Sequence, residues 1–178
     1  MMQYIGGVAP RRPLGLAGLF YGEHLIPPPP PPKLAVLIDY QNLHLTGRDT
    51  FAPVGATAKD TLVHPLKFAQ ELVTERAARQ GDATQRLAEL AYVGVYRGLP
   101  SNSHEARMYA VSQAQAAEWT RDARVHVWYR SLRYPPTWPH MPAREKGVDV
   151  KVAIDLVHCA IERRYDVIVL VWPARNSP

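Results

Sequence analysis

Three acidic side chains and one amide have the chemistry of a metal site built from oxygen ligands: Asp39, Asn42, Asp149 and Asp155. Asp39 is the first polar residue after the apolar run 34–38, and Asn42 follows three residues later. Burying a carboxylate costs desolvation free energy unless a cation or a hydrogen-bond donor meets it, so a divalent metal is a natural partner. The alternative is that Asp39 only caps a turn and Asn42 begins the next helix. The residues around Asp39 do not separate these two interpretations.

Asp149 and Asp155 belong to one expected helix. Gly147 precedes Asp149, and the helix dipole favours a carboxylate in the first turn whether or not it binds a ligand. Asp155 lies about 240° further round the helix, so the two acids cannot both point straight at one site. Asp155 stands between apolar neighbours in a helix expected to be buried. It is therefore expected to accept backbone hydrogen bonds or to pair with an arginine, with direct metal ligation as the alternative.

The elements that must position these acids alternate between strand and helix. Apolar runs predict strands at 34–38, 89–96, 125–130 and 166–172, with the first and last buried on both faces. Helical spacing predicts helices at 65–80, from a cap at Asn102 or Ser103 to about 120, and at 149–163, whereas 43–62 is expected to be a loop. This alternation predicts an α/β fold with a doubly wound parallel sheet of about four strands. If the last strand lies beside the first, Asp39 and Asp149 meet at the carboxyl edge of the sheet, and a divalent cation would relieve their repulsion.

Cationic and aromatic side chains are expected at the same edge. The cations that follow predicted strands or precede the last helix are Arg97, Arg130, Arg133 and Lys146. Tyr134 and Trp138, in the proline-rich loop 131–142, offer faces on which a base could stack. An acidic metal pocket flanked by cations and aromatic rings is typical of a phosphodiester site, although each arginine taken alone is equally well explained as a solvated loop residue. No His or Cys pair has zinc spacing, which leaves Mg²⁺ or Mn²⁺.

Composition limits the class of protein. The chain has 178 residues, 47% of them hydrophobic, and a formal charge of +5 with a single cysteine, Cys159. This balance fits one domain with a polyanionic partner, excludes an intrachain disulfide and is compatible with a reducing compartment, so we expect a cytoplasmic protein. No apolar run approaches the roughly 20 residues of a membrane span. Residues 1–32 hold eight of the 17 prolines and are expected to be a disordered leader, with the domain at 33–178.

Four segments resemble one known family. VLIDYQNL, RSLRYPP, REKGVDVKVAIDLV and YDVIVLV, in this order, are similar to the NYN family of PIN-like metal-dependent ribonucleases over about residues 33–172. The resemblance implies a PIN-like sheet, Mg²⁺ or Mn²⁺, and hydrolysis of RNA phosphodiester bonds. It implies that Asp39 is the first metal ligand, Asn42 its polar partner and Asp149 a further acid of the pocket, with Asp155 at another acidic position of the family.

The sequence departs from the family's pattern at its carboxyl end. In the family an acidic segment follows the last strand, whereas here no carboxylate follows Asp166. We therefore expect weakened metal binding, an exposed sheet edge that invites a homo-oligomer or another protein partner, and a chain that is a fragment of a longer protein. The alternative is a non-catalytic RNA-binding or protein-interaction remnant. A nucleotide-binding domain is less favoured, because no glycine-rich loop follows the first strand.

Overall fold

The computed structural model describes residues 29–57, 60–80 and 87–172. In chain order these form β1 (Lys33–Asp39), α1 (Tyr40–Phe51), α2 (Pro65–Gln80), β2 (Glu89–Leu99), α3 (Ala106–Trp119), β3 (Val125–Ser131), α4 (Val148–Ile161) and β4 (Val167–Val171). The predictions of a disordered leader and of a missing acidic segment fall mainly on residues 1–28 and 173–178, which lie outside the described residues. No helix of the described residues is long and apolar enough to cross a lipid bilayer.

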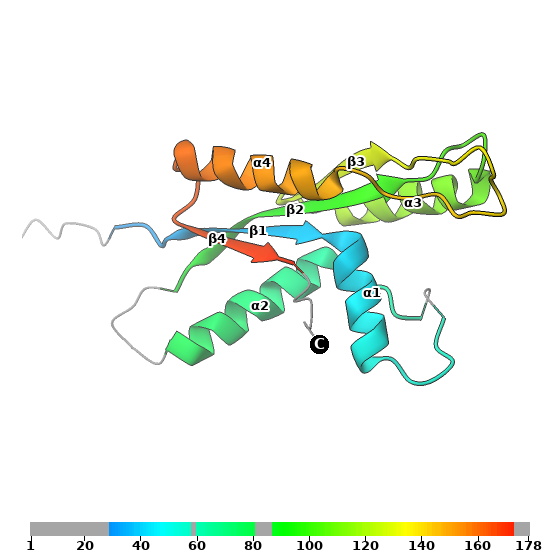
Figure 1. Ribbon diagram of the computed structural model, residues 1–178. Helices are drawn as coiled ribbons and strands as arrows, with labels where there is room; N and C mark the ends of the chain where they lie inside the picture. The colour runs from blue at the N-terminus through cyan, green and yellow to red at the C-terminus, as the bar shows by residue number, and fades with distance from the viewer. Residues whose placement is uncertain (1–28, 58–59, 81–86, 173–178) are drawn as a thin grey trace, which may run out of the picture.

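The four strands form one parallel sheet in the order β3-β2-β1-β4 (Figure 1). The predicted doubly wound α/β fold is confirmed, including the position of the last strand beside the first. Since parallel strands run the same way, their carboxyl ends meet at one edge of the sheet. At that edge Asp39 pairs in register with Tyr96 of β2.

Helices cover both faces of the sheet. Alternate side chains of β1 pack with α1, α2 and α3 on one face, in a cluster that includes Leu34, Val36, Ile38, Tyr40, Ala69 and Trp119. The other face is covered by α4, in a smaller cluster that includes Leu37, Tyr96, Val148 and Val152. Residues 34–38 are fully buried, as the non-alternating apolar run predicted for a central strand. The three layers are visible in Figure 1, where α4 lies above the sheet and α1 and α2 lie below it.

The expected loop at 43–62 is wrong in its first half, because α1 begins directly after β1 and continues to Phe51. Asp39 starts this helix as its N-cap, and its carboxylate accepts a hydrogen bond from the backbone N–H of Asn42. The helix accommodates Gly47 despite its low helical propensity. The cap expected at Asn102 or Ser103 is also wrong: α3 begins at Ala106, after a turn.

Two elements are more exposed than predicted. The helix α4, which has apolar residues nearly all round, was expected to be buried, yet it exposes an apolar stripe of Val150, Ile154, Val157 and Ile161. Only its inner side meets the sheet, and no other described element covers the outer side. The strand β4 was expected to be buried on both faces but is only half-buried, because among the described strands it pairs with β1 alone.

Candidate functional site

Asp39 lies at the carboxyl end of β1 and is 3% exposed. Its Oδ1 accepts from the backbone nitrogen of Asn42 at 3.2 Å, and its Oδ2 accepts from Nδ2 of Asn42 at 2.8 Å. Burial raises the pKa of Asp39 above its usual value; the two Asn42 bonds lower it, and the charge of Asp149 raises it further. An ionised carboxylate has about four lone-pair positions, so Asp39 keeps acceptor capacity for a further partner.

Glu145 is a second acid at this edge, and the sequence analysis did not single it out. The backbones of Arg133 and Arg144 form an isolated bridge that returns the proline-rich loop toward β2. Glu145 then accepts a hydrogen bond from the backbone nitrogen of Gly98. When the side-chain nitrogen of Gln41 faces Glu145, it lies 2.7 and 2.9 Å from the two carboxylate oxygens.

Burial raises the pKa of Glu145, the Gly98 hydrogen bond lowers it, and the charge of Asp39 raises it. The effect of one charge on the pKa of another group falls with distance. Asp39 therefore lies close enough to Glu145, and Asp149 close enough to Asp39, for their charges to interact. Bringing such acids together disfavours their ionised forms unless a cation intervenes. The carboxyl edge therefore assembles acids from β1, from the loop before α4 and from the first turn of α4.

Two glycines make room for this arrangement. A Cβ on Gly98 would lie 2.5 Å from Oε1 of Glu145 and closer still to the side chain of Leu132, so the observed position of the Glu145 side chain requires a residue without a Cβ at position 98. Gly147, just before α4, has a φ of +82°, in the left-handed region that favours glycine. A Cβ there would lie 3.2 Å from Nε of Arg130. A side chain at position 98 would therefore displace Glu145 and Leu132, whereas position 147 favours glycine because of its positive φ.

Asp155 belongs to a separate network. Its Oδ2 accepts from the hydroxyl of Tyr96 at 2.8 Å, and its Oδ1 accepts from Nζ of Lys151 at 2.5 Å. Burial raises the pKa of Tyr96, and its bond to Asp155 adds to this, so the phenol remains a donor. Asp155 therefore pairs with a lysine and a tyrosine, in place of the expected backbone or arginine, and both of its oxygens are engaged.

Of the four cations expected at the edge, one points away from it and three are exposed. Arg97 points toward α3: it donates to Gln115 at 2.7 Å, and its guanidinium lies 5.1 Å from the ring centre of Tyr40 and 5.6 Å from that of Trp119. Arg130 is exposed, but its Nε donates to the carbonyl of Lys146 at 2.9 Å. The side chains of Lys146 and Arg133 are exposed.

The two loop aromatics expected to stack on bases pack against each other. Tyr134 stacks on His104 with ring centres 4.2 Å apart, and Trp138 meets Tyr134 edge-on at 5.1 Å. The hydroxyl of Tyr134 donates to Glu105 at 2.6 Å and accepts from the backbone nitrogen of Ser101 at 2.8 Å. These contacts fix the proline-rich loop to the turn before α3.

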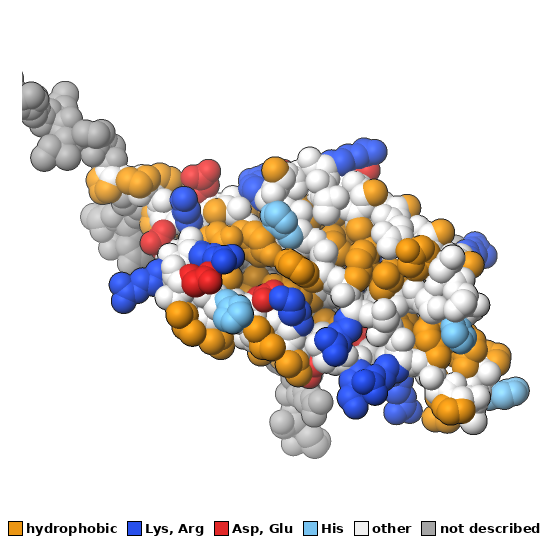
Figure 2. Space-filling model, turned by 90° about the horizontal axis from the view of Figure 1, so that it is seen from above, with side chains coloured by type: hydrophobic (Ala, Val, Ile, Leu, Met, Phe, Trp, Pro, Cys, Tyr) orange, Lys and Arg blue, Asp and Glu red, His pale blue; other side chains and the backbone are white. Residues whose placement is uncertain are grey.

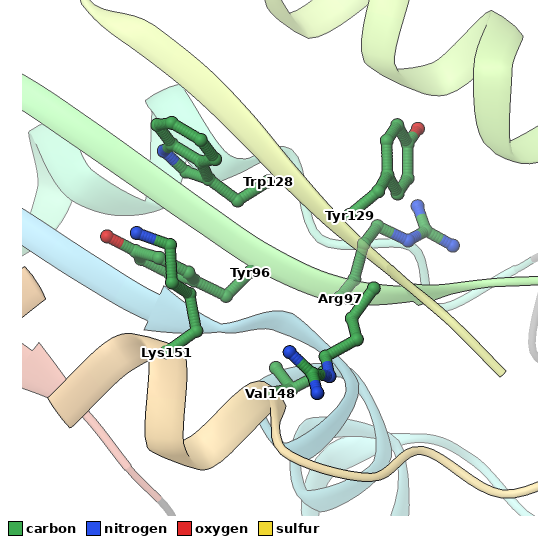
Figure 3. A pocket seen from close by; sticks show the side chains of 7 residues that line it. Tyr96, Arg97, Trp128, Tyr129, Val148 and Lys151 are labelled. Carbon is green, nitrogen blue, oxygen red and sulfur yellow. The ribbon is translucent and has the colours of Figure 1, made fainter. Parts of the chain in front are cut away.

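A cavity lies on each side of the carboxyl edge. The larger, about 710 Å³, lies between α1 and α3 and reaches Gly98 and Glu145. The smaller, about 120 Å³, lies between the ends of β2 and β3 and the start of α4. Figure 3 shows Tyr96, Trp128 and Lys151 gathered on one side of the sheet, while Arg97 and Tyr129 point to the other. Arg97 lines both cavities, and Glu145 lines the larger one.

The donor set fits Mg²⁺ or Mn²⁺. Asp39, Glu145 and Asp149 offer only oxygen, and the burial of Asp39 leaves a carboxylate whose charge a cation would compensate. Among residues 29–57, 60–80 and 87–172, no three His, Cys, Asp or Glu side chains are grouped so that they could hold a metal ion. Mg²⁺ usually keeps several of its waters and binds substrate phosphates as well, so it does not require such a group.

Comparison with known proteins gave one family. The sequence model of the family described as NYN domain matches residues 33–172, a range that includes every helix and strand described above. No curated protein and no solved structure matched the chain.

Proposed function

Because the chain belongs to the NYN family, we propose that it is a metal-dependent ribonuclease domain that hydrolyses RNA phosphodiester bonds. The observation that carries this proposal is the convergence of acids at the carboxyl edge, where the charge of Asp39 raises the pKa of Glu145 and the charge of Asp149 raises that of Asp39. Such mutual repulsion disfavours the fold unless a cation offsets it. RNA, a polyanion, suits a chain with a formal charge of +5.

We assign metal binding to Asp39, Glu145 and Asp149, with Mg²⁺ or Mn²⁺ as the cofactor. The bound metal would polarise the phosphoryl oxygens and lower the pKa of the attacking water. Asn42 holds both oxygens of Asp39 in place, and Gln41 lies against Glu145. These hydrogen bonds fix the direction of the carboxylates before substrate arrives.

The remaining predicted residues take supporting roles in this proposal. Arg130, Arg133 and Lys146 contact the RNA, because their side chains are exposed and all three stand on or beside the segment that carries Glu145. Arg97 instead joins β2 to α3 through Gln115 and the aromatic rings. We assign Asp155 to the positioning of Lys151 and Tyr96 and not to the metal, since the ammonium group of Lys151 already compensates its charge.

The test is cleavage of labelled single-stranded and hairpin RNA with Mn²⁺, Mg²⁺ or EDTA. Asp39→Asn and Asp149→Asn should each abolish metal-dependent cleavage. Asp155→Asn is the matched control: it removes the same charge from α4, keeps an acceptor for Tyr96 and should retain most activity. Cleavage that persists in EDTA, or in both Asp39→Asn and Asp149→Asn, would refute the proposal.

A non-catalytic RNA-binding domain is the second candidate. It is favoured by the absence of a preassembled three-residue metal cage among the described residues. RNA binding that is unchanged by EDTA, without cleavage at any metal concentration, would support this candidate. The Asp39→Asn variant would then bind RNA as tightly as the wild type.

The proposal also includes a protein contact and a location. The outer edge of β4 has no partner among the described strands, and such an edge can pair with a second copy of the chain. Sedimentation at increasing concentration tests this self-association. We place the protein in the cytoplasm, where RNA is available and where Cys159, a free buried thiol, stays reduced.

A further inference from the structure

The face of the sheet beneath α4 continues past the helix onto an uncovered strand. Along β3, Val125 and Val127 pack with the core below, so the alternating residues His126, Trp128 and Arg130 face the side of α4. The helix packs over β1 and β2, which leaves these three side chains exposed. Figure 2 looks down on this face and shows apolar side chains gathered there with Lys and Arg among them.

Trp128 is the centre of this surface. It is 47% exposed, its indole nitrogen lies 3.4 Å from the hydroxyl of Tyr92, and Nζ of Lys151 lies 4.6 Å from its ring centre. It borders the cavity of about 120 Å³ together with Arg130, Val148 and Lys151 (Figure 3). This volume is well below the roughly 300–1,000 Å³ of small-molecule sites, and it suits a single flat ring.

The spacing of two cavity residues along β3 leaves room for one such ring between their side chains. Trp128 and Arg130 are two residues apart on one strand, so their side chains leave the sheet about 6.6 Å apart. This is about twice the roughly 3.4 Å between stacked bases in a nucleic acid. A base between them would contact an indole on one face and a guanidinium on the other. Both surfaces stack well on bases.

Arg130 is held beside the cavity by the start of α4. Its Nε donates to the carbonyl of Lys146, and it lies against Gly147, where a Cβ would come within 3.2 Å of Nε. The cavity is closed by Val148, which directly precedes Asp149 of the acidic site. A base in this cavity therefore places its own backbone phosphate near the acids and near the exposed amine of Lys146.

We propose that this cavity is a base-binding site, in which one unpaired base of single-stranded RNA stacks between Trp128 and Arg130. The proposal rests on the proposed function, because it makes the cavity the subsite beside the scissile phosphate. A base within a duplex is already stacked and paired, so the site selects single strands. Stacking uses the face of a base, which every base has, so we expect little sequence preference.

The test measures binding in EDTA, so that cleavage does not enter. The probes are a fluorescein-labelled single-stranded RNA of mixed sequence and the same strand annealed to its complement. Trp128→Ala should weaken single-strand binding by about 5- to 100-fold. Trp128→Phe keeps an aromatic face and should bind within about threefold of the wild type. Ile154→Ala is the control, because Ile154 is a comparably exposed apolar residue of α4 outside the cavity.

A second readout covers the case in which Trp128→Ala does not fold. Single-stranded RNA should quench tryptophan emission of the wild-type chain, and this quenching should be lost in Trp128→Phe. Equal single-strand affinity of the wild type and a folded Trp128→Ala, or unchanged quenching in Trp128→Phe, would overturn the proposal. So would loss of self-association without loss of RNA binding in Trp128→Ala, which would identify the face as a protein interface.

These outcomes are separable from those of the nuclease proposal. A wild-type chain that never cleaves RNA but shows Trp128-dependent binding would refute the nuclease and retain the base site. Metal-dependent cleavage with single-strand binding that is indifferent to Trp128 would do the reverse.

Discussion

Replacing Glu145 tests the residue that the structure adds to the site. In Glu145→Ala the backbone N–H of Gly98, a buried residue of β2, loses its acceptor. A hydrogen bond to a charged group contributes about 1.5–3 kcal/mol, and an unsatisfied buried donor costs about 1–3 kcal/mol. Glu145 is itself only half-buried, so water can partly replace it. We therefore expect a net loss of about 1–2 kcal/mol of unfolding free energy, which lowers Tm by roughly 2–8 °C in a chain of this size.

Glu145→Gln separates the hydrogen bond from the charge. The amide oxygen still accepts from Gly98, and Gln41 can turn its own amide to match the new partner. Removing the negative charge relieves the repulsion with Asp39, so this variant should be at least as stable as the wild type in EDTA. Cleavage should nevertheless fall by about 100-fold or more. A 100-fold loss corresponds to about 2.8 kcal/mol of metal-binding free energy, since each 1.4 kcal/mol changes the affinity about tenfold.

Urea denaturation in EDTA measures the two stabilities, calorimetric titration with Mn²⁺ measures the metal affinity, and labelled RNA measures cleavage. Equal stabilities of Glu145→Ala and Glu145→Gln would show that the bond to Gly98 contributes little. Wild-type cleavage and Mn²⁺ affinity in Glu145→Gln would remove Glu145 from the metal site and refute the three-acid assignment.

Three further predictions concern the pKa of Asp39, the packing of Arg97 and the exposed cations. Because burial raises the pKa of Asp39, the folded chain binds the carboxyl proton more tightly than the unfolded chain, so stability falls as the pH rises from the unfolded pKa through the raised folded pKa. Asp39→Asn should remove this fall and be more stable than the wild type at neutral pH in EDTA, as measured by urea denaturation. An equal or lower stability of the variant would contradict this reasoning. Arg97→Lys should cost about 1–2 kcal/mol, because a lysine cannot reproduce the contacts with Tyr40, Trp119 and Gln115; an unchanged denaturation midpoint would count against it. RNA affinity should fall with salt with a log–log slope of about −1.4 if Arg133 and Lys146 each contact one phosphate, at roughly −0.7 per contact, and a slope near zero would argue against both contacts.

The sequence predicted the edge on which the site forms, because the signal for β1 is local. A fully apolar run without alternation requires burial on both faces, and the structure buries 34–38 completely. Alternation of strands and helices then fixed the parallel direction, and the first and last strands do pair. Asp39 and the start of α4 therefore reach the same edge, as expected on the condition that the last strand lies beside a central first strand.

Glu145 was missed because its position depends on a return of the chain that no local pattern records. The loop leaves β3, is bridged between Arg133 and Arg144, and only then brings Glu145 to Gly98. The available signal was an acid shortly before Asp149 in the run REKGVD, in a segment that the family resemblance already covered. A glycine near the end of β2 was the second signal, because close approach to a strand often requires one.

Arg97 shows how an error in a strand boundary changes the expected role of a residue. The strand was expected to end at Tyr96, which would have placed Arg97 on the carboxyl edge with the other cations. In the structure β2 continues to Leu99, so Arg97 lies within the strand and points to the opposite face from Tyr96. That face meets α3, where Gln115 and Trp119 engage the guanidinium. A shift of three residues in the boundary thus turned an expected RNA contact into a core contact.

The acids and the Trp128 cavity should respond differently to metal, although one RNA strand would cross both. Without a divalent cation, Asp39, Glu145 and Asp149 repel a phosphate, whereas stacking between Trp128 and Arg130 does not depend on metal. Adding Mn²⁺ to a cleavage-resistant RNA analogue should therefore tighten binding in the wild type and much less in Asp39→Asn. Trp128→Ala should lower the affinity by a similar factor with and without Mn²⁺, because the two contributions come from separate side chains and add. If Trp128→Ala lowered the affinity by a much larger factor with Mn²⁺ than in EDTA, the two contributions would not be additive, and the cavity and the metal site would form one cooperative unit.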